Sequence, residues 1–217
     1  MTPFRLDKHP DAPRSILCLG AHADDIEIGC GGTLLKLLRN TAETTVHWVV
    51  FSANAPREAE ARRSADRFLE EADESTVEVL NFRDSYFPSE RTAIKERIEK
   101  LARRVSPNVI FTHHREDRHQ DHRLLADLTW NVFRDHLILE YEIPKYDGDL
   151  GHPNVFVPLA ETIGRQKVEF LMDGFESQQE KPWFSADTFW ATMRLRGIES
   201  RHPYAEAFHG RKVVLHW

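Results

Sequence analysis

The sequence predicts an α/β fold in which a mostly parallel β-sheet is covered by helices on both faces. Apolar runs of strand length alternate with longer helical patterns along the first 133 residues, and each strand run is apolar on both faces. The 217 residues are enough for one domain with a buried core. In such sheets ligands bind beyond the carboxyl ends of the strands, so residues that directly follow a strand are the candidates for function.

Four strand and helix units are expected in order. The strands are the short apolar runs, rich in β-branched and aromatic residues, at 15–19, 45–52, 77–82 and 109–112. The helices follow them at 31–40, 57–72, 89–105 and about 121–133, the first opening at Gly31 and Gly32. Crossovers between parallel strands are right-handed, so this order predicts helices on both sides of the sheet.

The pattern changes after residue 133. Strand-like runs are expected at 137–143 and 154–157, a loop dense in turn residues at 144–153, and one more helix at 160–172. No linker, internal repeat or low-complexity tract divides the chain. We therefore expect a single domain, 1–217, with a core at about 14–135 and a C-terminal elaboration at about 136–217.

Composition excludes several classes of function. Lys and Arg total 29 against 35 Asp and Glu, and a formal charge of −6 argues against a nucleic-acid binder. No apolar run approaches the ~20 residues of a membrane span, and residues 1–15 lack the apolar stretch of a signal peptide, so we expect a cytoplasmic protein. With 12 His and only 2 Cys, any metal must be held by histidines and carboxylates.

The first candidate cluster directly follows the strand at 15–19. His22 and Asp25 lie three residues apart in a tight turn and can reach one cation, and Asp24 between them is placed to take a proton from a metal-bound water. Alternatively, an aspartate of this turn caps the next helix while the glycines allow close packing. A dinucleotide site is rejected, because the glycines do not follow the G-x-G-x-x-G spacing and two aspartates stand where a pyrophosphate would lie.

The second candidate cluster follows the strand at 109–112 and holds four histidines within ten residues. His119 and His122 lie three apart at the start of a helix, so both can point toward a common centre. A solvated polar loop with Asp121 as helix cap is the alternative. We favour metal binding for His119 and His122, and the solvated loop for His113 and His114.

Together, H-A-D-D-I-E-I-G-C-G-G-T-L at 22–34 and H-Q-D-H at 119–122 resemble the two signatures of the PIG-L/LmbE-like de-N-acetylases. Further matches extend over most of the chain: Arg57-x-x-Glu60 before Ala61-Arg62-Arg63-Ser64-Ala65, Ser106-Pro107, Lys167 with Ser177-Gln178, and Tyr204-Ala205-Glu206-Ala207-Phe208. The resemblance implies a Rossmann-like sheet and a metal-dependent enzyme that removes the acetyl group from N-acetylglucosaminyl compounds.

The resemblance also implies roles for individual residues. It implies that three side chains bind zinc: His22, Asp25 and His122. Asp24 would be the general base that activates zinc-bound water, and a protonated His119 would steady the oxyanion. Whether Asp24 or a histidine protonates the leaving amine stays open.

The chain departs from the family pattern at three positions. Ala23 and Gln120 stand where the family often has proline, which loosens two turns without removing a ligand. Ile26 precedes Glu27 where many members place Glu directly after the second aspartate, so Glu27 is considered only as a residue that supports the ligands.

Substrate contacts are suggested by fewer residues. Arg57 follows the second strand at the same sheet edge, either to bind a hydroxyl or phosphate or as an exposed arginine at a helix start. The loop at 146–153 is either a lid that carries His152 into the site or a plain surface loop. Aromatic side chains that could stack on a sugar face, or pack in a core or subunit contact, are Trp183, Phe184 and Trp190.

The sequence therefore predicts a metal-dependent N-deacetylase that hydrolyses the N-acetyl amide of a small N-acetylglucosamine-type conjugate, with Zn²⁺ or another divalent metal as its only cofactor. Two alternatives are a zinc hydrolase acting on a different amide and a metal-binding partner subunit without catalysis. No nucleic acid or membrane span is expected, and a homo-oligomer is compatible with the resemblance.

Overall fold

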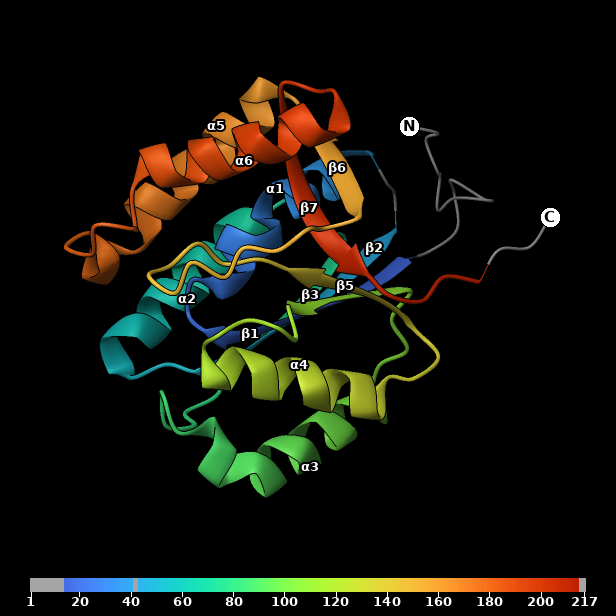
Figure 1. Cartoon of the computed structure of the whole chain (residues 1–217). Coiled ribbons are helices and arrows are strands. Elements are labelled where there is room, and N and C mark those ends of the chain that lie inside the picture. The colour runs from blue at the N-terminus through green and yellow to red at the C-terminus, as the bar shows by residue number, and fades with distance from the viewer. Residues whose placement is uncertain (1–13, 41–42, 215–217) are drawn as a thin grey trace.

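A seven-stranded sheet runs through the protein, as seen in a computed structural model that describes residues 14–40 and 43–214 (Figure 1). The strands lie in the order β3-β2-β1-β4-β5-β7-β6. Their bounds are Arg14–His22 (β1), Thr44–Ser52 (β2), Glu74–Val79 (β3), Val109–His113 (β4), Leu137–Tyr141 (β5), Val155–Leu159 (β6) and Tyr204–Gly210 (β7). Strands β1 to β5 pair in parallel, whereas β7 is antiparallel to β5 and β6. The predicted mostly parallel sheet is confirmed.

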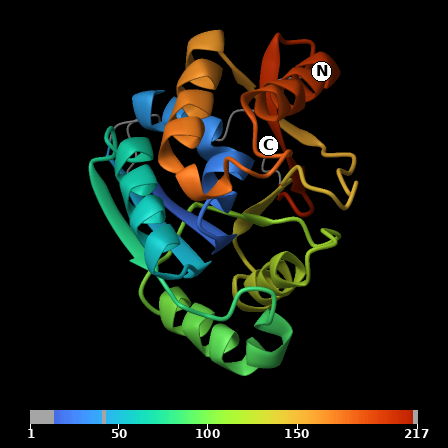
Figure 2. The ribbon, with the colours of Figure 1, turned by 90° about the vertical axis from the view of Figure 1, so that its left-hand side faces the viewer.

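Helices cover both faces of the sheet, as Figures 1 and 2 show from two directions. One face carries α1 (Asp25–Asn40), α2 (Ala55–Phe68), α5 (Glu161–Gly174) and α6 (Ala186–Ser200), and the other carries α3 (Arg91–Ala102) and α4 (Gln120–Val132). Short 3₁₀ turns lie at Phe87–Glu90 and Glu176–Gln178. Because helices pack on both faces, β1 and β4 are buried on both sides, which explains their continuous apolar runs.

The strand order reverses between β1 and β4. From β1 the chain moves to β2 and β3 on one side, and then returns to β4 and β5 on the other side. In open α/β sheets ligands commonly bind at such a reversal, beyond the carboxyl ends of the two strands, and this position is called the crevice below. His22 is the last residue of β1 and His113 is the last residue of β4, so both histidine-bearing segments begin at this crevice.

Helix α1 begins at Asp25, six residues earlier than the predicted start at Gly31. The glycines lie inside the helix, because neighbouring side chains approach its backbone closely. A Cβ on Gly29 would lie 2.2 Å from Cδ2 of Tyr141, and one on Gly31 would lie 2.6 Å from Cε1 of Phe68. Each glycine costs a helix about 1 kcal/mol relative to alanine, and here that cost is offset by the direct packing of α1 on β5 and α2.

Two elements near the C-terminus, α6 and β7, were not predicted. Helix α6 lacks a single apolar face, since Phe189 and Met193 are buried whereas Leu195 and Ile198 are exposed. Strand β7 has the sequence Y-A-E-A-F-H-G, with no β-branched residue. It lies between β5 and β6, so β6 becomes an edge strand and accommodates Pro158, which has no N–H to donate.

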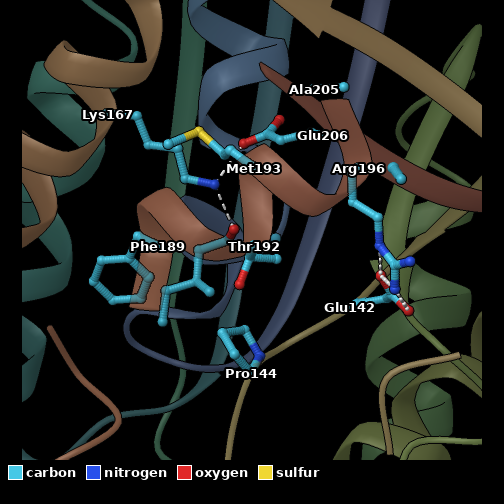
Figure 3. Close-up of a pocket in the computed structure, with 12 residues that line it drawn as sticks. Glu142, Pro144, Lys167, Phe189, Thr192, Met193, Arg196, Ala205 and Glu206 are labelled. Atoms are coloured by element: carbon cyan, nitrogen blue, oxygen red, sulfur yellow. Dashed lines mark hydrogen bonds and ion pairs between the residues drawn. The ribbon is translucent and has the colours of Figure 1, made fainter. Parts of the chain in front are cut away.

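A buried ion pair joins the C-terminal elements to α1 (Figure 3). Lys167 of α5 and Glu206 of β7 lie 2.5 Å apart, Nζ to Oε1, and both are almost fully buried. The carboxylate of Glu206 also accepts the main-chain N–H groups of Gly32 and Thr33, and Lys167 donates to the carbonyl oxygen of Ile28. Two charged side chains from distant parts of the chain thus bind the backbone of α1.

We predict that Lys167→Met lowers the free energy of unfolding by about 3–5 kcal/mol, because it leaves the Glu206 carboxylate buried without its cation. Chemical denaturation measures this loss. The double variant Lys167→Met/Glu206→Gln should recover part of it, since no unpaired charge remains. Arg165→Met on the same helix is the control, because Arg165 is exposed and its surface pair with Glu161 contributes less than about 1 kcal/mol. Equal losses in the two single variants would contradict the prediction.

Candidate metal centre

Three residues with donor side chains meet at the crevice. His22 ends β1, Asp25 begins α1, and His122 lies in the first turn of α4. His22 Nδ1 lies 3.1 Å from His122 Nε2 and 3.3 Å from Asp25 Oδ2, and the last two atoms are 3.6 Å apart. Two protein segments about a hundred residues apart in sequence therefore place three donor atoms in one small triangle.

This triangle fits a tetrahedral metal ion. Ligand bonds of about 2.0–2.1 Å at tetrahedral angles place donor atoms roughly 3.3 Å apart. All three residues are less than 10 % exposed, and two neutral imidazoles and one carboxylate are the ligand types that zinc takes in catalytic sites. Within the described residues, donor atoms of His119 and of His113 also lie within 4.8 Å of members of this set. The cluster is therefore denser than the sequence predicts.

Carboxylates hold the second ring nitrogen of both histidines. His22 Nε2 lies 3.1 Å from Oδ1 of Asp84 and 3.4 Å from Oδ2 of Asp121, and His122 Nδ1 lies 2.9 Å from Oδ2 of Asp117. A proton on each of these nitrogens leaves Nδ1 of His22 and Nε2 of His122 free as acceptors, which are the two atoms of the triangle.

Sequence reasoning missed Asp84 and Asp117 and took Asp121 only as a helix cap. The carboxylate of Asp121 accepts the main-chain N–H groups of Ser85 and Phe87, and it thereby ties the loop after β3 to the start of α4. Its place inside H-Q-D-H was a usable signal. Asp117 lies two residues before that motif, and Asp84 lies in a loop with no motif, so only folding brings Asp84 to His22.

Burial and the surrounding carboxylates set the charge state of the cluster. Burial lowers the pKa of His22, but Asp25, Asp121 and Asp84 together raise it well above 6.5. Burial raises the pKa of Asp25, yet His122, His113 and His22 bring it well below its usual range. Burial and the neighbouring His113 lower the pKa of His122 to about 3. Carboxylates thus surround the triangle, and this environment favours positive charge at its centre.

His119 is oriented as a hydrogen-bond donor toward the crevice. Its ring centroid lies 4.9 Å from that of His22 and 4.5 Å from that of His122. Its Nδ1 accepts the main-chain N–H of Asp121, and burial followed by the nearby His22 lowers its pKa. With Nδ1 occupied by this N–H, Nε2 is the ring atom left to contact a ligand.

Asp24 lies beside the triangle and pairs with Arg57. Arg57 Nη2 is 2.6 Å from Asp24 Oδ1, and Asp24 is 3 % exposed. Oδ2 of Asp24 and Nε of Arg57 are buried and make no hydrogen bond within the described part of the chain. A buried carboxylate oxygen without a partner is uncommon in folded proteins, so this oxygen is available to accept a hydrogen bond from a water or ligand. The structure therefore brings Arg57 to the site rather than leaving it exposed at a helix start.

His113 and His114 are buried, so the expected solvated loop is wrong for both. His113 Nε2 lies 3.2 Å from Asp25 Oδ2, and the ring stacks on His122 at 3.9 Å between centroids. His114 stacks on His209 at 3.7 Å. The reason is that β4 continues to His113 and its carboxyl end is covered by β5 and α4, so these rings fill space between the elements instead of facing water.

The remaining predicted substrate residues lie apart from the triangle. His152 is exposed, and within the described residues no hydrogen bond or ion pair joins it to the cluster, so its role stays a prediction. The aromatic residues Trp183, Phe184 and Trp190 pack against the core beside α5 and α6, which favours the core interpretation over stacking on a sugar.

Within residues 14–40 and 43–214, no helix has the length and apolar character needed to cross a bilayer. The proposed absence of a signal peptide concerns residues 1–15, most of which lie outside the described residues.

Two sequence comparisons with known proteins both point to deacetylases. Residues 17–133, which contain every member of the triangle, match the family PIG-L: GlcNAc-PI de-N-acetylase. A protein of Escherichia coli K12, named uncharacterized deacetylase YaiS, is 29 % identical over 142 residues, which cover 60 % of this chain and 75 % of the relative.

Solved structures share the fold at low sequence identity. The N,N'-diacetylchitobiose deacetylase of Pyrococcus horikoshii, solved with an inhibitor, is 19 % identical with a TM-score of 0.68, covering 94 % of this chain and 86 % of that chain. The 4-carboxy-2-hydroxymuconate hydratase GalB of Pseudomonas putida KT2440 is 15 % identical with a TM-score of 0.74, covering 94 % of this chain and 99 % of that chain. The fold alone therefore accommodates more than one reaction, whereas the sequence match is specific: the chain belongs to the PIG-L/LmbE-like de-N-acetylase family.

Proposed function

We propose that this protein is a zinc-dependent hydrolase that removes the acetyl group from the N-acetyl amide of a small N-acetylglucosamine-type conjugate. The observation that carries the proposal is the triangle of His22, Asp25 and His122 with the unpartnered Asp24 oxygen beside it. Family membership supports deacetylation as the reaction.

Each side chain of the cluster has a role in this proposal. His22, Asp25 and His122 would hold the divalent ion, with zinc as the expected metal, because two histidines and one carboxylate are a ligand set typical of catalytic zinc sites. Such an ion supplies an activated nucleophile at neutral pH and polarises the amide carbonyl. Asp24 accepts the proton of the attacking water at Oδ2, while Arg57 fixes the opposite oxygen. When the C–N bond breaks, the amine leaves with a proton from Asp24 or from a histidine. His119 donates its Nε2 proton as a hydrogen bond to the tetrahedral oxyanion, a type of contact worth about 3–4 kcal/mol.

The same arrangement bears on the competing functions. A metal-binding subunit without catalysis has no need of a buried, unpartnered carboxylate next to its metal ligands, so the orphaned Oδ2 of Asp24 favours an enzyme. A hydrolase acting on a different amide would use the same cluster and differ only in the residues around it.

We further propose that residues 1–217 act as one cytoplasmic domain, that the partner is a small N-acetyl sugar conjugate rather than nucleic acid, and that assembly into a homo-oligomer is compatible with this function.

The first test is Asp24→Asn. The amide keeps the shape of the side chain and a contact with Arg57 but accepts no proton, so acetate release should fall by about 10²–10⁴-fold while bound zinc stays at the wild-type level. Acetate is measured over a panel of N-acetyl sugars, and metal by elemental analysis. Asp173→Asn, an exposed aspartate on α5, is the matched control. Undiminished turnover by Asp24→Asn would contradict the assigned base.

Removal of the metal gives a second prediction. Chelation should abolish acetate release, and one equivalent of zinc should restore it, because the triangle offers one complete set of ligands. Zinc at about 100 times its dissociation constant should also raise the free energy of unfolding by about 2.7 kcal/mol. In His122→Ala neither effect should appear. Full activity in the chelated protein would exclude a metal-dependent reaction.

The variant Arg57→Gln distinguishes two roles for Arg57, which are binding the sugar and positioning Asp24. Loss of a charged hydrogen bond costs about 1.5–3 kcal/mol, or roughly 10–100-fold in kcat/KM. If Arg57 binds the sugar, KM should rise for an N-acetyl sugar more than for a minimal N-acetyl amine. An equal fall for both substrates would limit Arg57 to positioning Asp24.

A further inference from the structure

Asp117 organises the second histidine segment. Its Oδ1 accepts the main-chain N–H of His119 at 2.7 Å, and its Oδ2 lies 2.9 Å from Nδ1 of His122. The residue is 3 % exposed. One carboxylate therefore holds both the backbone that presents His119 and the ring of His122.

Lys145 supplies the counter-charge for this carboxylate. Its Nζ lies 3.0 Å from Asp117 Oδ2 and 2.5 Å from Asp149 Oδ2, and the exposed fractions of the side chains of Lys145 and Asp149 are 9 % and 6 %. The same oxygen of Asp149 accepts the main-chain N–H of Arg118 at 2.6 Å. The segment 145–149, called the strap below, is thus bound to the histidine segment by a buried ionic chain.

A second contact fixes the loop just beyond the strap. Arg196 of α6 pairs with both carboxylate oxygens of Glu142, at 2.9 and 2.8 Å from Nη2 (Figure 3). Glu142 accepts the N–H of Gly151 at 2.8 Å, and Arg196 donates to the carbonyl oxygen of Gly151 at 3.1 Å. Because Glu142 and Arg196 hold the loop at Gly151, the loss of Lys145 leaves the loop attached there.

We propose that Lys145 is a positioning residue of the metal centre, which acts through Asp117 to hold His122 in the orientation that binds a divalent cation. The inference rests on the proposed metal centre but not on deacetylation. A carboxylate shared between an ammonium and an imidazole N–H stays in one rotamer in a buried site. Without Lys145, the Asp117 carboxylate is buried without its counter-charge, so its side chain rotates toward water and away from His122. The proton on Nδ1 of His122 then loses its acceptor, and the ring no longer has one fixed tautomer. By thermodynamic linkage, metal binding at His122 stabilises the contact between the strap and Asp117 by the same free energy by which that contact stabilises metal binding.

Zinc affinity is the test, measured by competition with a chromophoric chelator on the purified full chain. Asp117→Asn should raise the zinc dissociation constant about 10–100-fold, as expected when a carboxylate that hydrogen-bonds a metal-binding histidine is lost. Lys145→Met should weaken it less. The double variant should lose no more than Asp117→Asn alone, because Lys145 acts only through Asp117. Lys95→Met, which removes an exposed lysine of α3, is the matched control and should not change affinity.

Hydrogen exchange gives an independent readout that needs no substrate. Zinc should slow exchange of the amide of Arg118 and of the strap in the wild-type protein and in Lys95→Met, and slow it less in Lys145→Met. If Lys145→Met does not fold, Lys145→Arg and Asp149→Asn replace it, and the arginine variant should retain most of the affinity. Unchanged zinc affinity in Lys145→Met, or losses that add in the double variant, would overturn the proposal. Since no step requires acetate release, a failure here is distinct from a failure of the proposed reaction.

Discussion

One oxygen atom, Oδ2 of Asp25, is the point on which the site depends. It accepts the main-chain N–H of His22 at 2.6 Å and lies 3.2 Å from Nε2 of His113 and 3.6 Å from Nε2 of His122. Burying an ionised carboxylate costs several kcal/mol unless positive charge or donors compensate. The ends of β1 and β4 and the starts of α1 and α4 must therefore converge on this oxygen, and a cation bound among them satisfies it most completely.

The close packing of α1 on the sheet follows from the same requirement. Asp25 reaches the crevice only if α1 starts directly after β1 and lies against β5, where Gly29 faces the ring of Tyr141. The hydroxyl of Tyr141 donates to the carbonyl oxygen of Leu19 and lies 3.3 Å from His113. A larger residue at position 29 would push the helix away and move Asp25 from its histidines. The glycines of the first motif thus position Asp25, the proposed metal ligand.

The sequence was informative where short-range patterns carry the signal. Strands β1, β2 and β4 read as apolar runs, and His22, Asp25 and His122 were identified from motifs whose spacing places them at the carboxyl ends of strands. Arg57 was also a candidate because it follows a strand, but two residues that reach the site from loops were not predictable. Asp84 comes from a loop without a motif. Lys145 directly precedes the 146–153 loop, which was considered as a lid or a plain surface loop but not as support for the histidines. His113 looked solvated because the cover provided by β5 and α4 is a long-range property, and β7 lacked the β-branched residues by which strands are recognised.

Strand β7 also determines when the protein can finish folding. The N–H of Gly32 and the carboxylate of Glu206 are separated by 174 positions in sequence, and β6 completes the sheet edge only by pairing with β7. A chain that has left the ribosome only as far as β6 contains all the proposed metal ligands, but α1 lacks its buried anion and β5 presents an open edge. Contacts of such large sequence separation close late and slow folding. The nascent chain therefore exposes the edge of β5, which favours aggregation, until β7 pairs with β5 and brings β6 into the sheet.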